Sequence, residues 1–493
     1  ESTTTGSYNT AIGQGALYSN TTHNCNAFGY NALLSNGSGS SNCAFGSHAL
    51  DNNTTGPRNT AMGHRAMDAN TTGSDNVAIG SNALDANTTA SNNVAVGHEA
   101  LTENTTGTNN TSIGTDSGKN QQTANACTWM GVEAGRDNTG NDNVGIGSGC
   151  MRLNTTGTRN TAVGTGVYGS THGALSANTT GTRNTALGCQ ALLNSTTGVS
   201  NTSIGAETLV NNTTGGYNVA VGRDALTSNT TGSENVAVGR ISLYTNTTGY
   251  SNVVIGDQAG YANTTGYQSV LIGPEAGEGN TTGYRNVAVG WRSMHASSTG
   301  HSNSAVGMES LRDLTSGTVN TAIGRSAGEQ VTTGDNNTLL GRNAGRAGSP
   351  SGAITTQSNR ICLGDDNVTD FFCKQSTIQT SDVRDKTDVT DFKHGLSWIE
   401  QLRPITYRWD MRSKYVDGKP DGSKKETRIN LGFIAQEVLE IEKEHGFASD
   451  KDMMLLVNEN DDGNYGMKYD RVVPILVNAI KELAAEVKAL KAA

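Results

Sequence analysis

The stretch NVAVGRDALTSNTTGSE, residues 218–234, is one copy of a unit that recurs through the first three quarters of the chain. Copies align on a glycine that closes an Asn-x-Ala-x-Gly segment, such as Gly222. Twenty-one such glycines lie between Gly13 and Gly364, and 16 of the 20 intervals between them are 17 residues long. A short, strict period of this kind predicts a stacked repeat architecture.

Most positions of the unit keep a recognisable chemical type. The residue before the closing glycine is apolar in all 21 units. Four residues after that glycine stands a large apolar side chain, such as Leu226, or a second glycine, such as Gly260. The Asn-Thr-Thr-Gly segment at residues 229–232 predicts a turn, because glycine tolerates positive φ and asparagine bonds local backbone or stacks on the next asparagine.

Seventeen residues with two short strand segments and two tight turns predict one coil of a parallel β-helix or β-roll. A helical solenoid is excluded, because its repeats run to about 33 to 47 residues. Coils stacked about 4.8 Å apart would form a shaft roughly 100 Å long. Each coil offers only two or three inward apolar side chains, so we expect three chains to share a core. A narrow single-chain β-roll is the alternative.

Composition and charge exclude several classes of partner. The net charge is -10 and no basic stripe occurs, so we expect no nucleic-acid binding. No apolar run approaches the roughly 20 residues of a membrane span, so we expect no membrane insertion.

The seven cysteines are irregularly spaced and no Cys-x-x-Cys pair occurs. We therefore predict reduced cysteines, no metal and no cofactor.

Lysine usage divides the chain. Residues 1–373 contain a single lysine, Lys119, whereas residues 374–493 contain thirteen. The glycine period also ends at Gly364. We therefore predict a repetitive shaft at residues 1–364, a linker at 365–380 and a second domain at 381–493.

The second domain carries four sequence blocks. They are SDVRDK at 381–386, LRPITYRW at 402–409, LGFIAQEV at 431–438 and the pair Tyr469-Asp470 before a C-terminal helix. In this order they resemble the intramolecular chaperone domain of phage endosialidases and tail fibres, a self-cleaving serine peptidase family. The shaft units resemble the heads of trimeric autotransporter adhesins and the repeats of phage and bacterial tail-fibre-like proteins. The resemblance to the chaperone domain implies a small α+β fold for residues 381–493.

The same resemblance implies a cleavage site. The matching bond is Thr380–Ser381, with Ser381 as nucleophile and Lys386 as base. This chemistry needs a deprotonated lysine, which desolvation in a packed domain favours by lowering the pKa. The scissile bond is already in place, so one turnover suffices. Asp382 would orient the site or contact a neighbouring chain; the alternative is that it caps local backbone.

The C-terminal helix carries apolar residues at alternating intervals of three and four. This spacing predicts the a/d seam of a coiled coil and hence trimerisation. The alternative is a helix packed on its own domain. The seam residues are Val473, Leu476, Ile480, Leu483, Val487 and Leu490.

Two features are candidates for receptor binding. One insertion into the period, between Gly164 and Gly188, contains Tyr168 and His172, and a second lies between residues 341 and 364. Loops on a rigid scaffold often carry recognition, although tolerated surface insertions are the alternative. Aromatic residues also share one phase in successive units, where they either stack on sugar rings or stack on each other. They are Tyr250, Tyr267, Tyr284 and His301.

These observations predict a mainly β, trimeric fibre protein, such as a tail fibre of a virion that attaches to a host-surface receptor or glycan. Its C-terminal domain would drive trimer assembly and then release itself by autoproteolysis, with no catalysis on an external substrate. The alternative function is a bacterial surface adhesin or extracellular filament with the same chaperone.

Overall fold

The computed structural model describes residues 6–166, 172–368, 384, 386–412, 415, 419–459 and 463–492. The chain forms two compact units, Glu1–Thr338 with Thr356–Arg360 and Leu339–Thr355 with Ile361–Ala493. The sequence-based limits of shaft, linker and C-terminal domain stay a prediction. Among the residues described, none of the helices has the length and apolarity needed to cross a bilayer.

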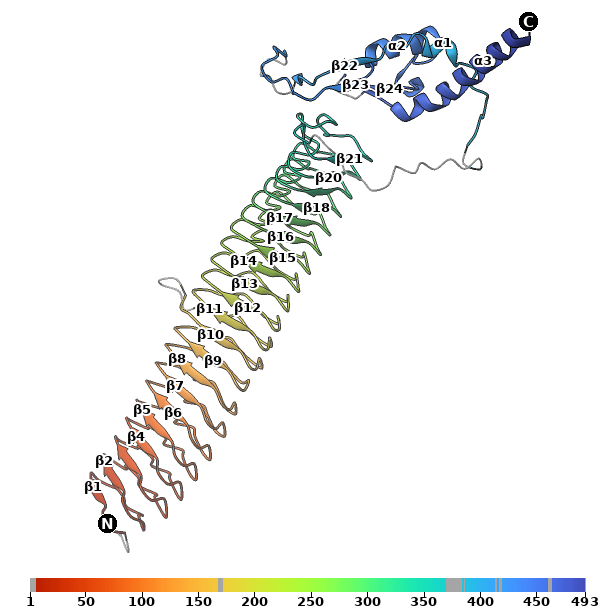
Figure 1. The fold of residues 1–493 in the computed structure, drawn as a ribbon. Coiled ribbons are helices and arrows are strands. Elements are labelled where there is room, and N and C mark those ends of the chain that lie inside the picture. Colours follow the sequence, from red (N-terminus) through yellow and green to blue (C-terminus); the bar gives the residue numbers. More distant parts are fainter. Residues whose placement is uncertain are drawn as a thin grey trace. The chain divides into compact units, whose positions relative to one another are not determined.

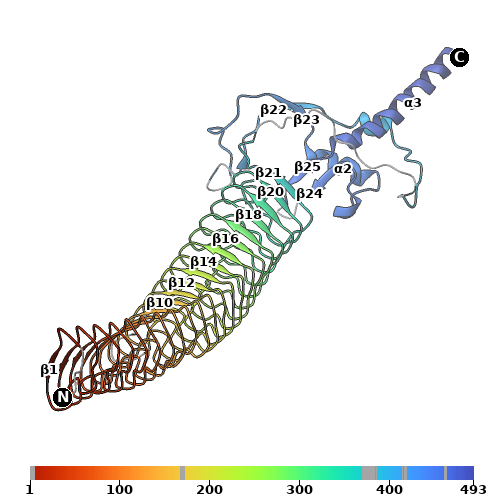
Figure 2. The ribbon, with the colours of Figure 1, turned by 90° about the horizontal axis from the view of Figure 1, so that it is seen from below.

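The first unit is a parallel β-solenoid, which confirms the predicted fold class. Each coil contributes one three-residue strand, and the strand arrows stack coil upon coil (Figure 1). Neighbouring strands pair in parallel and in register, so that Val219, Ala220 and Val221 lie opposite Val236, Ala237 and Val238. The same pairing runs without a break from β1 to β19. Seen from below in Figure 2, the coils keep one common outline.

The strands have the following bounds: β1 (Thr10–Ile12), β2 (Asn26–Phe28), β3 (Cys43–Phe45), β4 (Thr60–Met62), β5 (Val77–Ile79), β6 (Val94–Val96), β7 (Thr111–Ile113), β8 (Thr128–Met130), β9 (Val144–Ile146), β10 (Thr161–Val163), β11 (Thr185–Leu187), β12 (Thr202–Ile204), β13 (Val219–Val221), β14 (Val236–Val238), β15 (Val253–Ile255), β16 (Val270–Ile272), β17 (Val287–Val289), β18 (Ser304–Val306), β19 (Thr321–Ile323), β20 (Thr338–Leu340) and β21 (Ile361–Leu363).

The expectation of two strands per coil is wrong. After each strand the chain enters a run of turns, as at residues 223–228. Three residues of this coil have left-handed backbone, with φ of 59° at Asp224, 53° at Leu226 and 61° at Glu234. Left-handed residues bend the chain and cannot extend a strand, so one side of each coil alone is a β-strand.

The coil interior is small and partly polar. Ala220, Ala225 and Leu226 are fully buried, which matches the two or three inward apolar side chains expected per coil. In most coils two asparagines are also buried, here Asn218 and Asn229. The residue before the closing glycine lies on the other face of the strand and points outward, because successive strand side chains alternate.

The buried asparagines form two ladders along the solenoid. The Asn235 amide N–H donates to Asn218 Oδ1 at 3.0 Å, and its Nδ2 donates to the Gly249 carbonyl at 2.9 Å. In the second ladder Asn229 Nδ2 donates to Asn212 Oδ1 at 2.8 Å and to its own turn, at the Gly232 carbonyl, at 2.9 Å. Buried amides therefore find partners from coil to coil, which makes the polar interior tolerable.

The closing glycine is required by space as well as by conformation. Gly222 has φ +125°, and a Cβ there would lie 2.6 Å from the carbonyl oxygen of Gly239 in the next coil. Any other residue would force apart the backbones of stacked coils, so this position is glycine in each unit.

The second unit ends in a small α+β fold, as predicted. The two hairpin-like pairs are β22 (Ile405–Tyr407) with β23 (Asn430–Gly432) and β24 (Val457–Glu459) with β25 (Tyr465–Met467), both antiparallel. The helices are α1 (Leu396–Ile399), α2 (Ala435–Glu444) and α3 (Val472–Ala492), with 3-10 turns η3 (Lys451–Met453) and η4 (Tyr469–Arg471). Their core centres on Trp398, which is fully buried.

Candidate functional site

The second, third and fourth sequence blocks of the C-terminal domain come together in the fold. Arg403 of the second block forms an ion pair with Glu437 of the third, with Nε 3.1 Å from Oε2. The amide N–H of Phe433 donates to the Tyr469 hydroxyl at 3.2 Å, which joins the third block to the fourth. Glycine is needed at Gly432, since a Cβ there would lie 2.4 Å from the Tyr469 hydroxyl.

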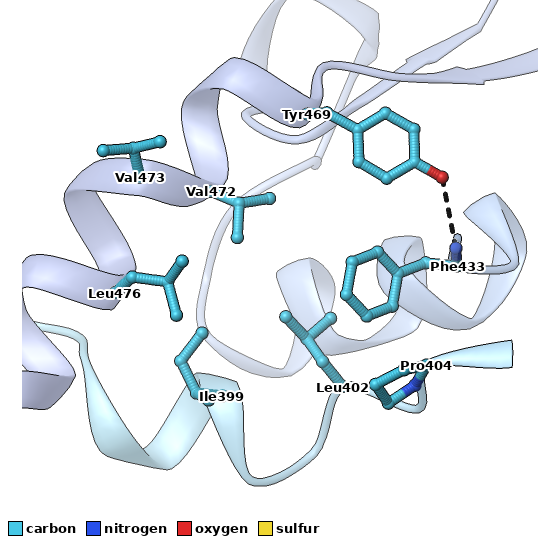
Figure 3. Close-up of a pocket in the computed structure, with 8 residues that line it drawn as sticks. All are labelled: Ile399, Leu402, Pro404, Phe433, Tyr469, Val472, Val473 and Leu476. Carbon is cyan, nitrogen blue, oxygen red and sulfur yellow. Dashed lines mark hydrogen bonds between the residues drawn. The ribbon is translucent and has the colours of Figure 1, made fainter. Parts of the chain in front are cut away.

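Apolar residues from these blocks line an open groove of about 370 Å³ (Figure 3). Side chains of the second, third and fourth blocks meet the first turns of α3 there. Sequence reasoning missed this groove, although four of its residues lie within the quoted blocks and signal it. The lining residues are Ile399, Leu402, Pro404, Phe433, Tyr469, Val472, Val473 and Leu476.

Helix α3 has two distinct apolar faces. One face packs on its own domain: Val472, Ile475 and Ala479 are buried. Polar side chains anchor the same face, because Asn478 Nδ2 donates to the Phe392 carbonyl at 2.6 Å and Glu482 Oε2 accepts from the Leu396 amide at 2.6 Å.

The predicted seam lies beside this packed face of α3. All six of its residues are exposed, from 40% at Leu476 to 78% at Leu490. Packing on the domain therefore uses residues other than the seam residues. The two alternatives for this helix, a coiled-coil seam and packing on its own domain, thus apply to different faces. Val473 and Leu476 belong to both the seam and the groove, so the two surfaces are continuous.

A buried carboxylate organises the domain on the side of α2. Glu442 is fully buried and accepts from three successive backbone N–H groups, at Leu455, Leu456 and Val457. The Oε–N distances to Leu455 and Val457 are 3.2 and 3.1 Å. Three donors of this kind stabilise a buried charge, so Glu442 ties α2 to the start of β24.

The predicted cleavage residues are only partly visible. Thr380, Ser381 and Asp382 lie outside the described residues. Lys386 is described and exposed, so the single chain does not supply the desolvation that was expected for the base. Their mutual geometry therefore stays a prediction.

The aromatic residues of the shaft stack on each other. Ring centroids are 5.0 Å apart between Tyr250 and Tyr267 and 4.8 Å apart between Tyr267 and Tyr284, with nearly parallel planes. His301 continues the stack 4.6 Å beyond Tyr284. Tyr267 and Tyr284 thus have both ring faces covered, which leaves their edges for any ligand. In the insertion, His172 is exposed and Tyr168 lies outside the described residues.

On the described coil surfaces, three separate groups each bring one histidine and two carboxylate side chains close together. Each group contacts a basic side chain: Arg65 is 3.1 Å from Asp68, Lys119 is 3.4 Å from Asp116 and Arg292 is 2.9 Å from Glu275. We interpret them as surface ion-pair networks, because these carboxylates already face a cation.

Residues 381–447 match a family model described as chaperone of endosialidase, and the match begins at Ser381. Searches of the curated proteins and of the solved structures gave no match. The matched family is of the self-cleaving, serine-peptidase type. The match, together with the β-solenoid, fits a tail-fibre-like protein with a C-terminal chaperone-of-endosialidase domain.

Proposed function

We propose that the protein is a trimeric fibre for host attachment, assembled by its C-terminal domain, which then cuts itself off between Thr380 and Ser381. The observation that carries the proposal is the family match, which starts at the predicted nucleophile. A virion, with this protein as its tail fibre, is the location that fits this function. Mass spectrometry of purified virions tests the location, because shaft peptides are either present or absent there.

Helix α3 supports assembly through three copies. Its seam presents six exposed apolar residues, whereas the neighbouring face of the helix packs on the domain. A helix with a free a/d seam associates with other such helices, and identical chains supply them at equal concentration. The continuous groove extends the same apolar surface onto the domain.

The cleavage chemistry follows from the residues at the start of the match. The Ser381 hydroxyl adds to the carbonyl carbon of Thr380 as Lys386 takes its proton. The C–N bond then breaks as the amine of Ser381 is protonated, which leaves an ester. Water hydrolyses the ester and frees the domain from the shaft. The nucleophile and the bond are neighbours in the chain, so no substrate pocket is needed.

Assembly followed by release suits a shaft of near-identical coils. Such coils pair out of step by one unit at little local cost, and parallel non-local pairing nucleates slowly. A C-terminal trimer holds three chains together and raises their effective concentration. Removal of that domain afterwards leaves the finished fibre without a route to reassembly, so its stability becomes kinetic.

Denaturing gels and intact masses of Ser381→Ala and Ser397→Ala test the cleavage. Ser397 is exposed in α1 of the same domain and serves as the matched control. We expect fragments ending at residue 380 and starting at 381 in the control, and one full-length chain in Ser381→Ala. Fragments of these masses from Ser381→Ala would show that another residue is the nucleophile.

A further inference from the structure

An uncharged face runs along the first unit. It consists of the first and third residues of strands β1–β19, called here the outer strand face. The third residue is apolar in all 19 strands, and the first is Val or Thr in 16 of them. In none of the 19 strands is the first or the third residue Asp, Glu, Lys or Arg.

The outer strand face is open to solvent. Ile79, Ile255 and Ile323, spread along its length, are 37%, 39% and 47% exposed. The third residues form an apolar row along all 19 strands. Soluble proteins seldom leave an apolar surface of this length uncovered, and such surfaces mark interfaces. The inward face of the same strands is filled mostly by fully buried alanines, so the strands have apolar side chains on both faces.

Charged residues flank this face on both sides. On one side Arg58 Nε lies 2.6 Å from Asp75 Oδ1, and both residues sit two positions before a strand. On the other side Arg240 Nε lies 2.9 Å from Asp257 Oδ1, two positions after a strand. An apolar centre between charged borders is the anatomy of a protein–protein interface.

We propose that the outer strand face is the surface through which copies of this chain pack along the shaft. A second copy is the partner that fits, because it alone repeats with the same rise of about 4.8 Å per coil over the whole length. Nineteen strands at that spacing, three residues wide, present roughly 860 Å², close to the roughly 800 Å² per partner of a stable interface. The inference rests on the proposed trimer and names the shaft surface that the trimer buries.

Copies held together by their α3 helices lie parallel and in step, so rotational symmetry brings the same residue of each copy to the same level. A cysteine on the outer strand face of one copy then faces its equivalents. Val238→Cys in β14 places such a probe. Thr231→Cys, at an exposed turn position seven residues earlier, is the matched control. Both are made with Cys43→Thr, since Cys43 is itself the first residue of β3.

The full-length variants are oxidised or treated with a short bis-maleimide and run on a denaturing gel, and native mass spectrometry gives their oligomeric state. We expect cross-linked dimers at least tenfold more abundant for Val238→Cys than for Thr231→Cys. An oligomer whose Val238→Cys chains do not cross-link would overturn the inference while the proposed trimer stands. A single chain by native mass would overturn both.

Discussion

Replacing Ile480 tests the seam of α3 quantitatively. The side chain is 66% exposed in the single chain. Complete burial of an isoleucine contributes about 1.5 to 3 kcal/mol, so burying the exposed part contributes roughly 1.5 kcal/mol per chain and about 4.5 kcal/mol in a trimer. Ile480→Ser removes this term. At about 1.4 kcal/mol per decade, the association constant falls roughly a thousandfold.

A refolding series measures this loss. Chains carrying Ser381→Ala, which keeps α3 attached, are refolded over a range of concentrations and assayed by sedimentation velocity. Because trimer formation depends on the cube of the free-chain concentration, a thousandfold smaller constant raises the midpoint concentration about thirtyfold. Lys488→Ser, on the same helix but off the seam, is the control. Equal midpoints for the two variants, with helicity unchanged, would refute assembly through the seam.

Three further predictions concern the interior of each unit. Gly135→Leu introduces the side chain most common at this coil position, yet a Cβ there would lie 2.2 Å from the Trp129 ring. We expect thermal unfolding to show a loss of about 3 kcal/mol in stability, which is regained when Trp129→Ala is added. Additive effects of the two substitutions would contradict the packing. Burial raises the pKa of the Cys127 and Cys150 thiols to about 11. The stabilisation by the neutral thiols is complete below about pH 9 and is lost as the pH rises through 11. Iodoacetamide at pH 8 should therefore label both cysteines only after unfolding. Peptide mapping that finds them labelled in the folded protein would contradict this. Glu442→Ala leaves the buried N–H groups of Leu456 and Val457 and the part-buried N–H of Leu455 unpaired. Chemical unfolding of the C-terminal domain should therefore show a loss of about 2 to 4 kcal/mol; a loss under about 0.5 kcal/mol would mean that water replaces the carboxylate.

Trp129 shows why part of the repeat pattern is explained only by packing. The sequence shows that some units carry glycine where others carry leucine, as at Gly118 and Gly135. In the structure the indole of Trp129 occupies the alanine position of its strand and fills the space beside both glycines. Its Nε1 donates to Gln121 Oε1 at 2.9 Å. The neighbouring Gly145 replaces the usual alanine for the same reason.

The sequence by itself determined the period, the stacked parallel coils and the C-terminal blocks, because a repeating backbone can satisfy its hydrogen bonds from coil to coil wherever side chains of one type recur. It also determined which apolar residues of α3 line up along one side, since helical spacing places them there.

Only the tertiary structure decided which apolar residues remain uncovered. Strand residues alternate between two faces, and the sequence does not say which face the coil closes around. The left-handed turns close it around the alanines, as at Ala220, and leave Val221 outside. The groove beside Tyr469 likewise arises from blocks far apart in the chain, and contacts of that kind depend on the fold as a whole.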